Sequence, residues 1–249
     1  MTGGIRVFPL EGIPEVEEGD DLVALLAEAA DRAGGLADAD VLVVAQKIVS
    51  KAEGRVVSLE GIEPSERAHE LAGDRDPRHV EAILRESVRV VRSRPPLVIS
   101  ETRHGFVCAS AGVDASNAKG PRTLILLPLD PDGSATRLRE GLHARTGRDI
   151  GVIVSDSFGR AFRHGTTDVA LGVAGVVSVV DLACLRDRAG YELQGTEIAV
   201  ADELAGAAQL VMGKLDGNPA AVVRGLDLRG DGSGRDLVIP PERDLFGRS

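Results

Sequence analysis

Aromatic residues are scarce in this chain of 249 residues, and several other features are absent. It has five Phe, one Tyr and no Trp, so the core must be built from aliphatic side chains and a flat ligand finds few rings. Two cysteines cannot form a disulfide framework or a structural zinc site. The apolar runs are far shorter than the roughly 20 residues of a membrane helix, and no segment resembles a secretion signal. We expect a cytoplasmic globular protein with no membrane partner.

The charge balance argues against a nucleic-acid partner. Acidic residues number 39 and basic residues 29, which gives a formal net charge of −10. A surface this acidic repels a phosphate backbone. Only four of the basic residues are lysines, at positions 47, 51, 119 and 214, so each lysine is a candidate for a role that needs a compact ammonium group.

Hydrophobic periodicity predicts a mixture of strands and helices. We expect strands at 5–8, 41–45, 97–100, 105–109, 123–127, 150–154, 171–180 and 219–223. We expect helices at 21–32, 65–71, 77–91, 131–146 and 197–212. This order favours an α/β or α+β fold, and the composition marks no domain boundary.

Familiar catalytic motifs are missing. The sequence has no P-loop and no dinucleotide-binding glycine motif between a strand and a helix. It also has no GxSxG nucleophile motif and no HExxH metal motif. A nucleotide or metal site, if one is present, must therefore be built from other segments.

Two segments carry carboxylates beside small residues. Asp114 and Asn117 lie in Ala111–Asn117, where their oxygens suit a hard cation or a nucleotide; the alternative is an Asx-turn. Asp156 and Ser157 follow a buried strand, at the position where α/β sheets bind ligands. After them, Arg160 and Arg163 can hold phosphate or carboxylate; the alternative is a capped loop with solvated arginines.

Two further segments carry lysines. Gln46, Lys47 and Lys51 follow the strand at 41–45, where lysine can neutralise phosphate; the alternative is a solvated strand end. The loop at 211–219 contains two glycines and Lys214 and could wrap a nucleotide; the alternative is a helix stop. Together the four segments supply the parts of a metal–nucleotide site without a P-loop.

Six motifs, taken in order, resemble one family. They are Phe8–Ile13, Lys47–Arg55, Ala111–Asn117, Leu129–Ser134, Ser155–Arg160 and Ala201–Ala205. The chain is similar over about residues 5–228 to the coenzyme F420-0:L-glutamate ligases, also called F420 gamma-glutamyl ligases. The resemblance implies an α+β (mixed α/β) fold of two intimately packed subdomains with mixed β-sheets. It implies a single ligase domain over 1–249, without the nitroreductase-like domain that follows the ligase in some members.

The resemblance also implies an activity. The family uses GTP to activate the carboxylate of F420-0, a deazaflavin that carries phospholactate, and then joins L-glutamate to it by an amide bond. Later glutamates are joined through gamma-carboxylates. The implied cofactors are Mn²⁺ or Mg²⁺, two per site, and the family allows a K⁺ ion. It further implies a homodimer.

Site residues follow from the same resemblance. Asp114 and Asp156 would bind one divalent ion, and Ser157 would contribute to a second. Many relatives have Glu in the sequence Met-Gly-Glu where this chain has Lys214, and a protonated lysine cannot ligate a cation. The expected GTP contacts are Glu11, Gly12, Ile13, Pro14, Gln46, Lys47, Lys51, Asn117, Met212, Gly213, Lys214, Leu215, Asp216, Gly217 and Asn218.

Arg160 and Arg163 are our own candidates for binding the substrate phosphate or carboxylate, on the ground of residue type and position. Two other functions remain open from the sequence. One is a metal-dependent phosphotransferase or nucleotide hydrolase, and the other is a non-catalytic protein that binds GTP or a deazaflavin.

Overall fold

The computed structural model describes residues 4–120 and 122–246. The α-helices are α1 (Leu22–Arg32), α2 (Gln46–Ala52), α3 (Glu66–Ala72), α4 (Pro77–Glu86), α5 (Pro131–Thr146) and α6 (Val200–Met212). The strands are β1 (Arg6–Pro9), β2 (Val41–Ala45), β3 (Val56–Ser58), β4 (Ser87–Arg94), β5 (Leu97–Thr102), β6 (Val107–Ala109), β7 (Thr123–Ile125), β8 (Gly151–Gly159), β9 (Thr166–Ala174), β10 (Val180–Asp181), β11 (Glu197–Ile198) and β12 (Ala220–Arg224).

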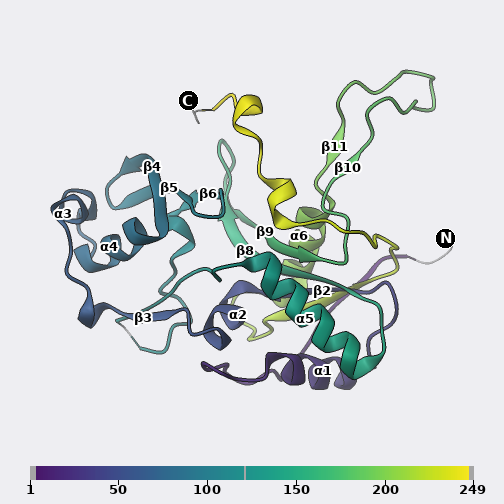
Figure 1. The fold of residues 1–249 in the computed structure, drawn as a ribbon, viewed down its shortest axis with the longest axis horizontal. Helices are drawn as coiled ribbons and strands as arrows, with labels where there is room; N and C mark the ends of the chain where they lie inside the picture. Colours follow the sequence, from purple (N-terminus) through teal and green to yellow (C-terminus); the bar gives the residue numbers. More distant parts are fainter. Residues whose placement is uncertain (1–3, 121, 247–249) are drawn as a thin grey trace.

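A five-stranded mixed sheet forms the centre of the molecule, with strand order β1-β12-β2-β8-β9 (Figure 1). β12 runs antiparallel to both β1 and β2, whereas β2 and β8 are parallel. β8 and β9 form a long antiparallel hairpin. Consequently β1, β2 and β8 all run toward the same edge of the sheet, where β12 begins.

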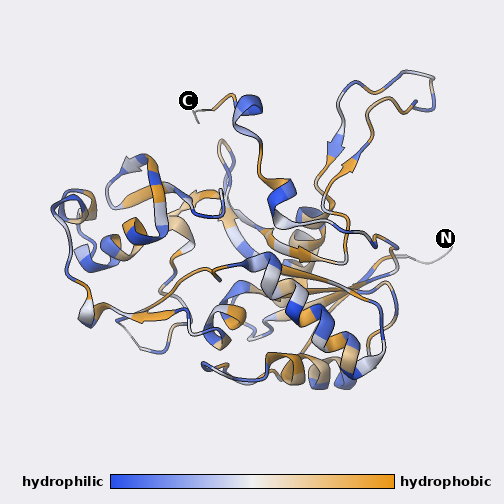
Figure 2. Cartoon of the chain, viewed as in Figure 1, coloured by the Kyte–Doolittle hydropathy of each residue, from blue (hydrophilic) through white to orange (hydrophobic). Residues whose placement is uncertain are grey.

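Helices cover both faces of this sheet because its strands are apolar on both sides. Leu42 and Val44 of β2 pack with α1 and α5 on one face. Val41 and Val43 alternate to the other face and pack with α6. The colouring in Figure 2 shows α5 with hydrophobic and hydrophilic residues on the same helix. Among the described residues, no helix has an apolar stretch long enough to cross a bilayer.

Residues 56–126 form a smaller unit with a core of its own. It contains the two-stranded sheet β3-β7, the helices α3 and α4, and the three-stranded sheet β4-β5-β6. Ile83, Val98 and Leu124 are fully or almost fully buried in its hydrophobic cluster. In Figure 1 this unit lies beside the central sheet. The mixed fold with two packed parts agrees with the expected fold class.

Two segments extend from the central sheet. Residues 180–198 form a narrow arm that begins with the short β10-β11 pair, and this arm projects away from the sheet (Figure 1). The segment 234–246 passes over the outer ends of β8 and β9. Arg243 of this segment contacts Glu197 of β11 by two hydrogen bonds of 3.2 and 2.6 Å, which fixes the segment beside the base of the arm.

Most predicted elements are confirmed, and three are wrong in extent. The helix expected over 197–212 begins at Val200, because Glu197–Ile198 pairs with β10 as strand β11. The helix expected over 77–91 ends at Glu86, because Ser87–Arg94 pairs with β5 as strand β4. The strand expected over 171–180 ends at Ala174 and begins at Thr166, since Gly175 has φ +72° and turns the chain out of the sheet. Helix α2 was not predicted from the sequence.

Candidate active site

The predicted site segments meet at one edge of the central sheet. Residues 10–14 leave β1 at this edge, and Gln46 and Lys47 follow β2. Ala45 pairs with Ser155 of β8, which places Asp156 just beyond the same point. The loop 213–219 enters β12 there, since the Ala45 amide donates to the carbonyl oxygen of Pro219 at 2.8 Å. Segments up to two hundred residues apart are therefore neighbours.

Asp114 forms an ion pair with Lys47. The Lys47 ammonium lies 2.6 Å from Asp114 Oδ2 and also donates to Ser116 Oγ at 2.6 Å. The Ser116 amide donates to Asp114 Oδ1 at 2.7 Å, so the predicted Asx-turn is also present. Burial disfavours ionisation of Asp114, but hydrogen bonds from Lys47 and Ser116 outweigh it and hold the pKa below its ordinary value.

The loop before Asp114 has an unusual backbone. Ser110, Ala111 and Gly112 all have positive φ, at 56°, 51° and 71°. A Cβ at Gly112 would lie 2.6 Å from Leu127, so only glycine fits there. The chain then hydrogen-bonds between Asp114 and Ile125 in both directions, at 3.0 and 2.8 Å. This tight turn aims Asp114 at the end of β2, and such strain is common at functional sites.

Asp156 is a carboxylate in an unfavourable environment. Burial raises its pKa to about 7. Repulsion from the charges of Asp114 and Asp168 contributes to this raised pKa. The Ser157 amide and the Lys47 ammonium lower the pKa and so oppose it. The charges of Asp156 and Asp114 thus influence each other, although 42 positions separate them in the sequence. The two aspartates converge around Lys47, and a second positive charge there would favour ionisation of both.

Ser157 points away from this pair, because consecutive residues of a strand face opposite sides of a sheet. Its hydroxyl donates to Asp168 Oδ1 at 2.6 Å and accepts from Gln209 Nε2 at 3.3 Å. Ser155 donates to the other oxygen of Asp168 at 3.2 Å. Asp168 is buried, and it was not among the site residues predicted from the sequence. Its position opposite Ser157 in the next strand becomes apparent only once the pairing of β8 with β9 is known.

Gln46 has a buried polar group without a partner. It is 1% exposed, and its Oε1 accepts from Ser50 at 2.9 Å. Its Nε2 has no hydrogen-bond partner among the described residues. A buried amide of this kind is costly unless a ligand completes it. Gln46 begins α2 at the carboxyl end of β2, so its free donor supports the prediction of a ligand contact there.

The remaining expected nucleotide contacts border the same edge. The carbonyl oxygens of Glu11 and Gly12 accept from Arg32, at 3.1 and 3.0 Å, and Ile13 packs into the core while Pro14 is exposed. Lys51 pairs with Glu15.

The loop at the end of α6 begins at Met212, which is buried. Gly213 caps the helix with φ +63°, as the alternative of a helix stop requires. Lys214, Leu215, Asp216 and Gly217 are exposed, and Asn218 is half-buried.

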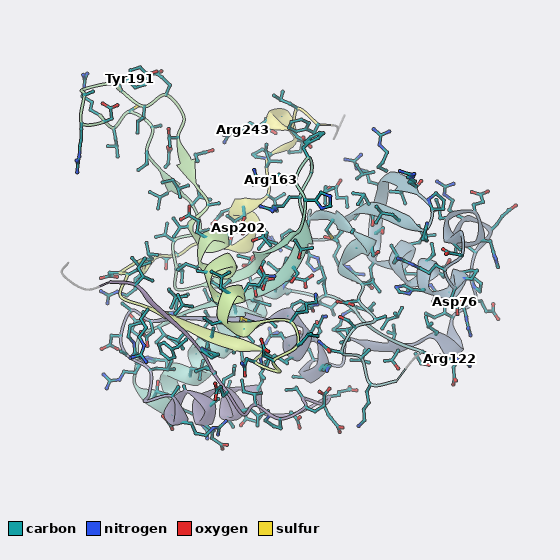
Figure 3. All side chains as sticks on the ribbon, turned by 180° about the vertical axis from the view of Figure 1, so that it is seen from behind. Asp76, Arg122, Arg163, Tyr191, Asp202 and Arg243 are labelled. Atoms are coloured by element: carbon teal, nitrogen blue, oxygen red, sulfur yellow. The ribbon has the colours of Figure 1, made fainter. Side chains whose placement is uncertain are left out.

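Three further candidate site residues in the described part of the chain, Asn117, Arg160 and Arg163, form no hydrogen bond or ion pair with Asp114, Asp156 or Lys47. Asn117 lies three residues beyond Asp114, with a left-handed φ of 58°. Arg160 and Arg163 are exposed in the β8–β9 turn, where Arg160 donates to the carbonyl oxygen of His164 at 3.2 Å. Figure 3 shows Arg163 on this extension of the hairpin. Arg160 also lines a cavity of about 600 Å³ that Asp168 and Asp202 share.

The carboxylates fit a divalent ion that arrives with a polyphosphate. Among residues 4–120 and 122–246, no three His, Cys, Asp or Glu side chains gather as a complete metal site. Mg²⁺ is commonly held by one or two carboxylates together with substrate phosphates and water. Asp114 and Asp156 supply that number, and the raised pKa of Asp156 marks a negative site that a cation would stabilise.

These features define a mixed α/β protein whose candidate site lies at the carboxyl ends of its strands, the usual place for ligands in such folds. The family model for F420-0:Gamma-glutamyl ligase matches residues 12–225. The chain is 47% identical over 250 residues to the coenzyme F420:L-glutamate ligase of Methanothermobacter thermautotrophicus, covering 98% of this chain and 99% of the relative.

Further relatives give the same result. The coenzyme F420:L-glutamate ligase of Methanopyrus kandleri is 46% identical, with 98% of this chain and 99% of the relative covered. That of Archaeoglobus fulgidus is 43% identical, with 98% and 97% covered. The chain therefore belongs to the F420-0:gamma-glutamyl ligase family, and it is an enzyme of the ligase class.

Proposed function

We propose that this protein joins L-glutamate to coenzyme F420-0 and that GTP supplies the energy through an acyl phosphate. The carrying observation is the convergence of Asp114 and Asp156 around Lys47 at the edge where the predicted nucleotide-binding segments meet. Relatives over almost the whole length carry the name of this ligase activity. The nucleotide, the ions and the intermediate are parts of our proposal.

Each side chain has a role in the proposed complex. Gln46 Nε2 is a buried donor for the nucleotide, and the Met212–Asn218 loop borders it. Lys51 is buried and pairs with the more exposed Glu15, from which it can turn to a phosphate. Lys47 can likewise exchange its contact with Asp114 for one with a phosphate oxygen. Arg160 and Arg163 would hold the substrate phosphate or carboxylate.

A divalent ion, Mn²⁺ or Mg²⁺, would be held by Asp114 and Asp156, and when bound it screens the triphosphate charge and stabilises the departing phosphate. Both aspartates must be ionised to hold it, and Lys47 already favours that form of Asp114. Ser157 would contribute to a second ion only by turning from Asp168. Lys214, which cannot ligate a cation while protonated, would contact phosphate instead. A K⁺ ion remains part of the proposal.

The reaction proceeds in two transfers. A carboxylate oxygen of F420-0 attacks the γ-phosphorus of GTP, and GDP leaves. The amine of glutamate then attacks the carbonyl carbon of the acyl phosphate, the bond to the phosphate oxygen breaks, and the amine proton passes to solvent. Carboxylates are poor electrophiles until this activation, which is why a nucleotide is needed. In later rounds the same steps act on the gamma-carboxylate of the added glutamate.

Mass spectrometry tests the proposal directly. Purified protein is incubated with F420-0, L-glutamate, GTP and Mn²⁺, and we expect product masses that increase by whole glutamyl units with matching GDP and phosphate. Reactions without glutamate serve as controls. With all substrates present, GTP loss without glutamate incorporation would indicate a nucleotide hydrolase or phosphotransferase, and GTP binding without any product would indicate a non-catalytic binding protein. Either result would contradict the proposal.

We also propose a homodimer, supported by the arm at 180–198. The arm is held by its own hydrogen bonds, such as that from the Cys184 amide to the Leu193 carbonyl oxygen at 2.9 Å. Tyr191 lies at its outer end (Figure 3), and Tyr191 and Leu185 are 63% and 55% exposed. A projecting arm that exposes large side chains such as Leu185 and Tyr191 is typical of a segment that packs on a second subunit. We expect twice the chain mass in sedimentation equilibrium; a monomer at micromolar concentration would contradict it.

A further inference from the structure

Four of the five phenylalanines gather around one cavity. The cavity measures about 340 Å³, and Phe106, Phe158 and Phe246 line it. Phe162 packs on Phe246, with ring centroids 6.0 Å apart. These residues come from the β5–β6 connection, β8, the β8–β9 turn and the C-terminal segment, so no single element explains the cluster. The chain has only six aromatic residues, so the gathering of four phenylalanines at one cavity indicates a functional role for that cavity.

The cavity has rigid aromatic walls. Phe106 and Phe158 meet edge to face with ring centroids 6.3 Å apart. His104 stacks on Phe106 at 5.6 Å and is fixed by a hydrogen bond to the Leu129 carbonyl oxygen at 3.1 Å. Phe106 is 9% exposed, whereas Phe246 is 82% exposed. The inner wall is therefore preformed, and the outer wall presents an aromatic ring that a ligand can cover.

The cavity continues the active site along two strands. Phe158 follows Asp156 by two residues in β8, so both side chains point to the same face, about 7 Å apart along the strand. Phe106 immediately precedes β6, two residues before Cys108 of that strand. Burial raises the pKa of the Cys108 thiol to about 12, and Asp156 contributes to that increase, so Cys108 lies near Asp156. The Asp156 carboxylate therefore lies at one end of the surface formed by β8 and the residues beside β6, and the rings of Phe106 and Phe158 lie at the other end.

The polar groups of the cavity are few. Asp202 of α6 lies on its wall, held by the Ala170 amide at 2.8 Å. Arg89, which pairs with Glu101 at 2.7 Å, and Asp244 also line the cavity. The rest of the lining is largely apolar, including Val91, Val169 and Leu237. A mostly apolar pocket with a few oriented polar groups is the usual environment for a flat organic ligand.

We propose that this cavity binds the deazaflavin ring system of the substrate, between Phe106, Phe158 and Phe246, while the phospholactate end extends toward Asp156. The inference rests on the proposed function, because it assigns a position to the substrate of that reaction. A cavity of about 340 Å³ is at the lower end of the range for small-molecule pockets, which suits the ring but not the whole substrate. The offset and edge-to-face arrangements of aromatic rings favour such stacking.

Fluorescence titration of the deazaflavin tests this placement. We expect Phe158→Leu and Phe246→Leu to weaken F420-0 binding about tenfold each, with Mn²⁺–GTP affinity changed less than twofold. Each variant should also bind a deazaflavin that lacks phospholactate about tenfold more weakly than the wild-type protein does, because the substitutions remove contacts to the ring only. Phe246 is largely exposed, so its variant carries little risk of misfolding.

Phe8→Leu is the matched control. Phe8 is the fifth phenylalanine and lies on β1 at the far edge of the sheet, under Arg6 and Arg224. Its variant should bind F420-0 with wild-type affinity. Unchanged F420-0 affinity in both the Phe158 and Phe246 variants would overturn the placement, even if the wild-type protein adds glutamate. Equal losses in the Phe8 variant would also overturn it, whereas failure of the wild-type protein to add glutamate would refute the proposed function itself.

Discussion

Replacing Asp156 with Asn is expected to reduce the rate of glutamate addition by at least about a thousandfold. The amide keeps the size of the side chain and can still accept from the Ser157 amide, but it removes one of the two negative charges that converge beside Lys47. A divalent ion would then lose a charged ligand at the point where the transferred phosphate reacts. The rate is measured by product mass spectrometry at saturating GTP and Mn²⁺.

Asp231→Asn provides the control, since Asp231 is exposed and is not one of the candidate site residues. Its rate should equal that of the unmodified protein. Mn²⁺ binding in the presence of GTP, followed by electron paramagnetic resonance, separates loss of the ion from loss of folding. Turnover of Asp156→Asn within tenfold of wild type would remove Asp156 from the reaction.

The central fold is largely predictable from the sequence because its strands are short, continuous apolar runs. Val41–Ala45 is one example, and its alternate residues pack against α1 on one face and α6 on the other. The start of the first helix was also predictable, since Asp21 accepts from the backbone amide of Ala24 as an N-cap. Local signals were sufficient wherever capping and periodicity agreed.

The errors occurred where a long-range partner overrides the local pattern. Ser87–Arg94 continues the helical spacing of α4, yet it pairs with β5 as a strand. The register between β8 and β9 shifts near Val154, and β9 starts at Thr166, well before the apolar run that suggested a strand. Strand pairing depends on residues distant in sequence, so a single window cannot reveal it.

The candidate site shows the same division. Asp114, Asp156 and Lys47 could be selected individually from their types and positions after strands. Their proximity could not be derived from spacing, because it depends on the parallel pairing of β2 with β8 and on the positive-φ turn at Ser110–Gly112. The six ordered motifs that the chain shares with the ligase family indicated that these residues form one site, which residue spacing alone could not indicate. The orphaned amide of Gln46 and the hydroxyl contacts of Asp168 are visible only in three dimensions.

The second large effect concerns stability in the absence of metal and nucleotide. The pKa of Asp156 is raised from 3.8 to about 7 in the folded protein, so the folded state binds a proton more tightly than the unfolded state. The contribution of Asp156 to stability should therefore increase as the pH falls from about 7 toward 4 and should be least favourable above pH 7. At about 1.4 kcal/mol per pH unit, the ionised carboxylate costs up to about 4 kcal/mol above pH 7.

Asp156→Asn removes this cost. In buffer with EDTA at pH 8, we expect the variant to melt about 5 to 10 °C above the wild-type protein, and the difference should shrink toward zero near pH 4. Mn²⁺ with GTP should raise the melting temperature of the wild-type protein and leave that of the variant almost unchanged, because only the wild-type protein keeps both carboxylates. A melting difference that is independent of pH would show that the carboxylate is not held in an unfavourable environment. Greater stability together with lost activity is the combination expected of a carboxylate retained for binding a cation rather than for folding.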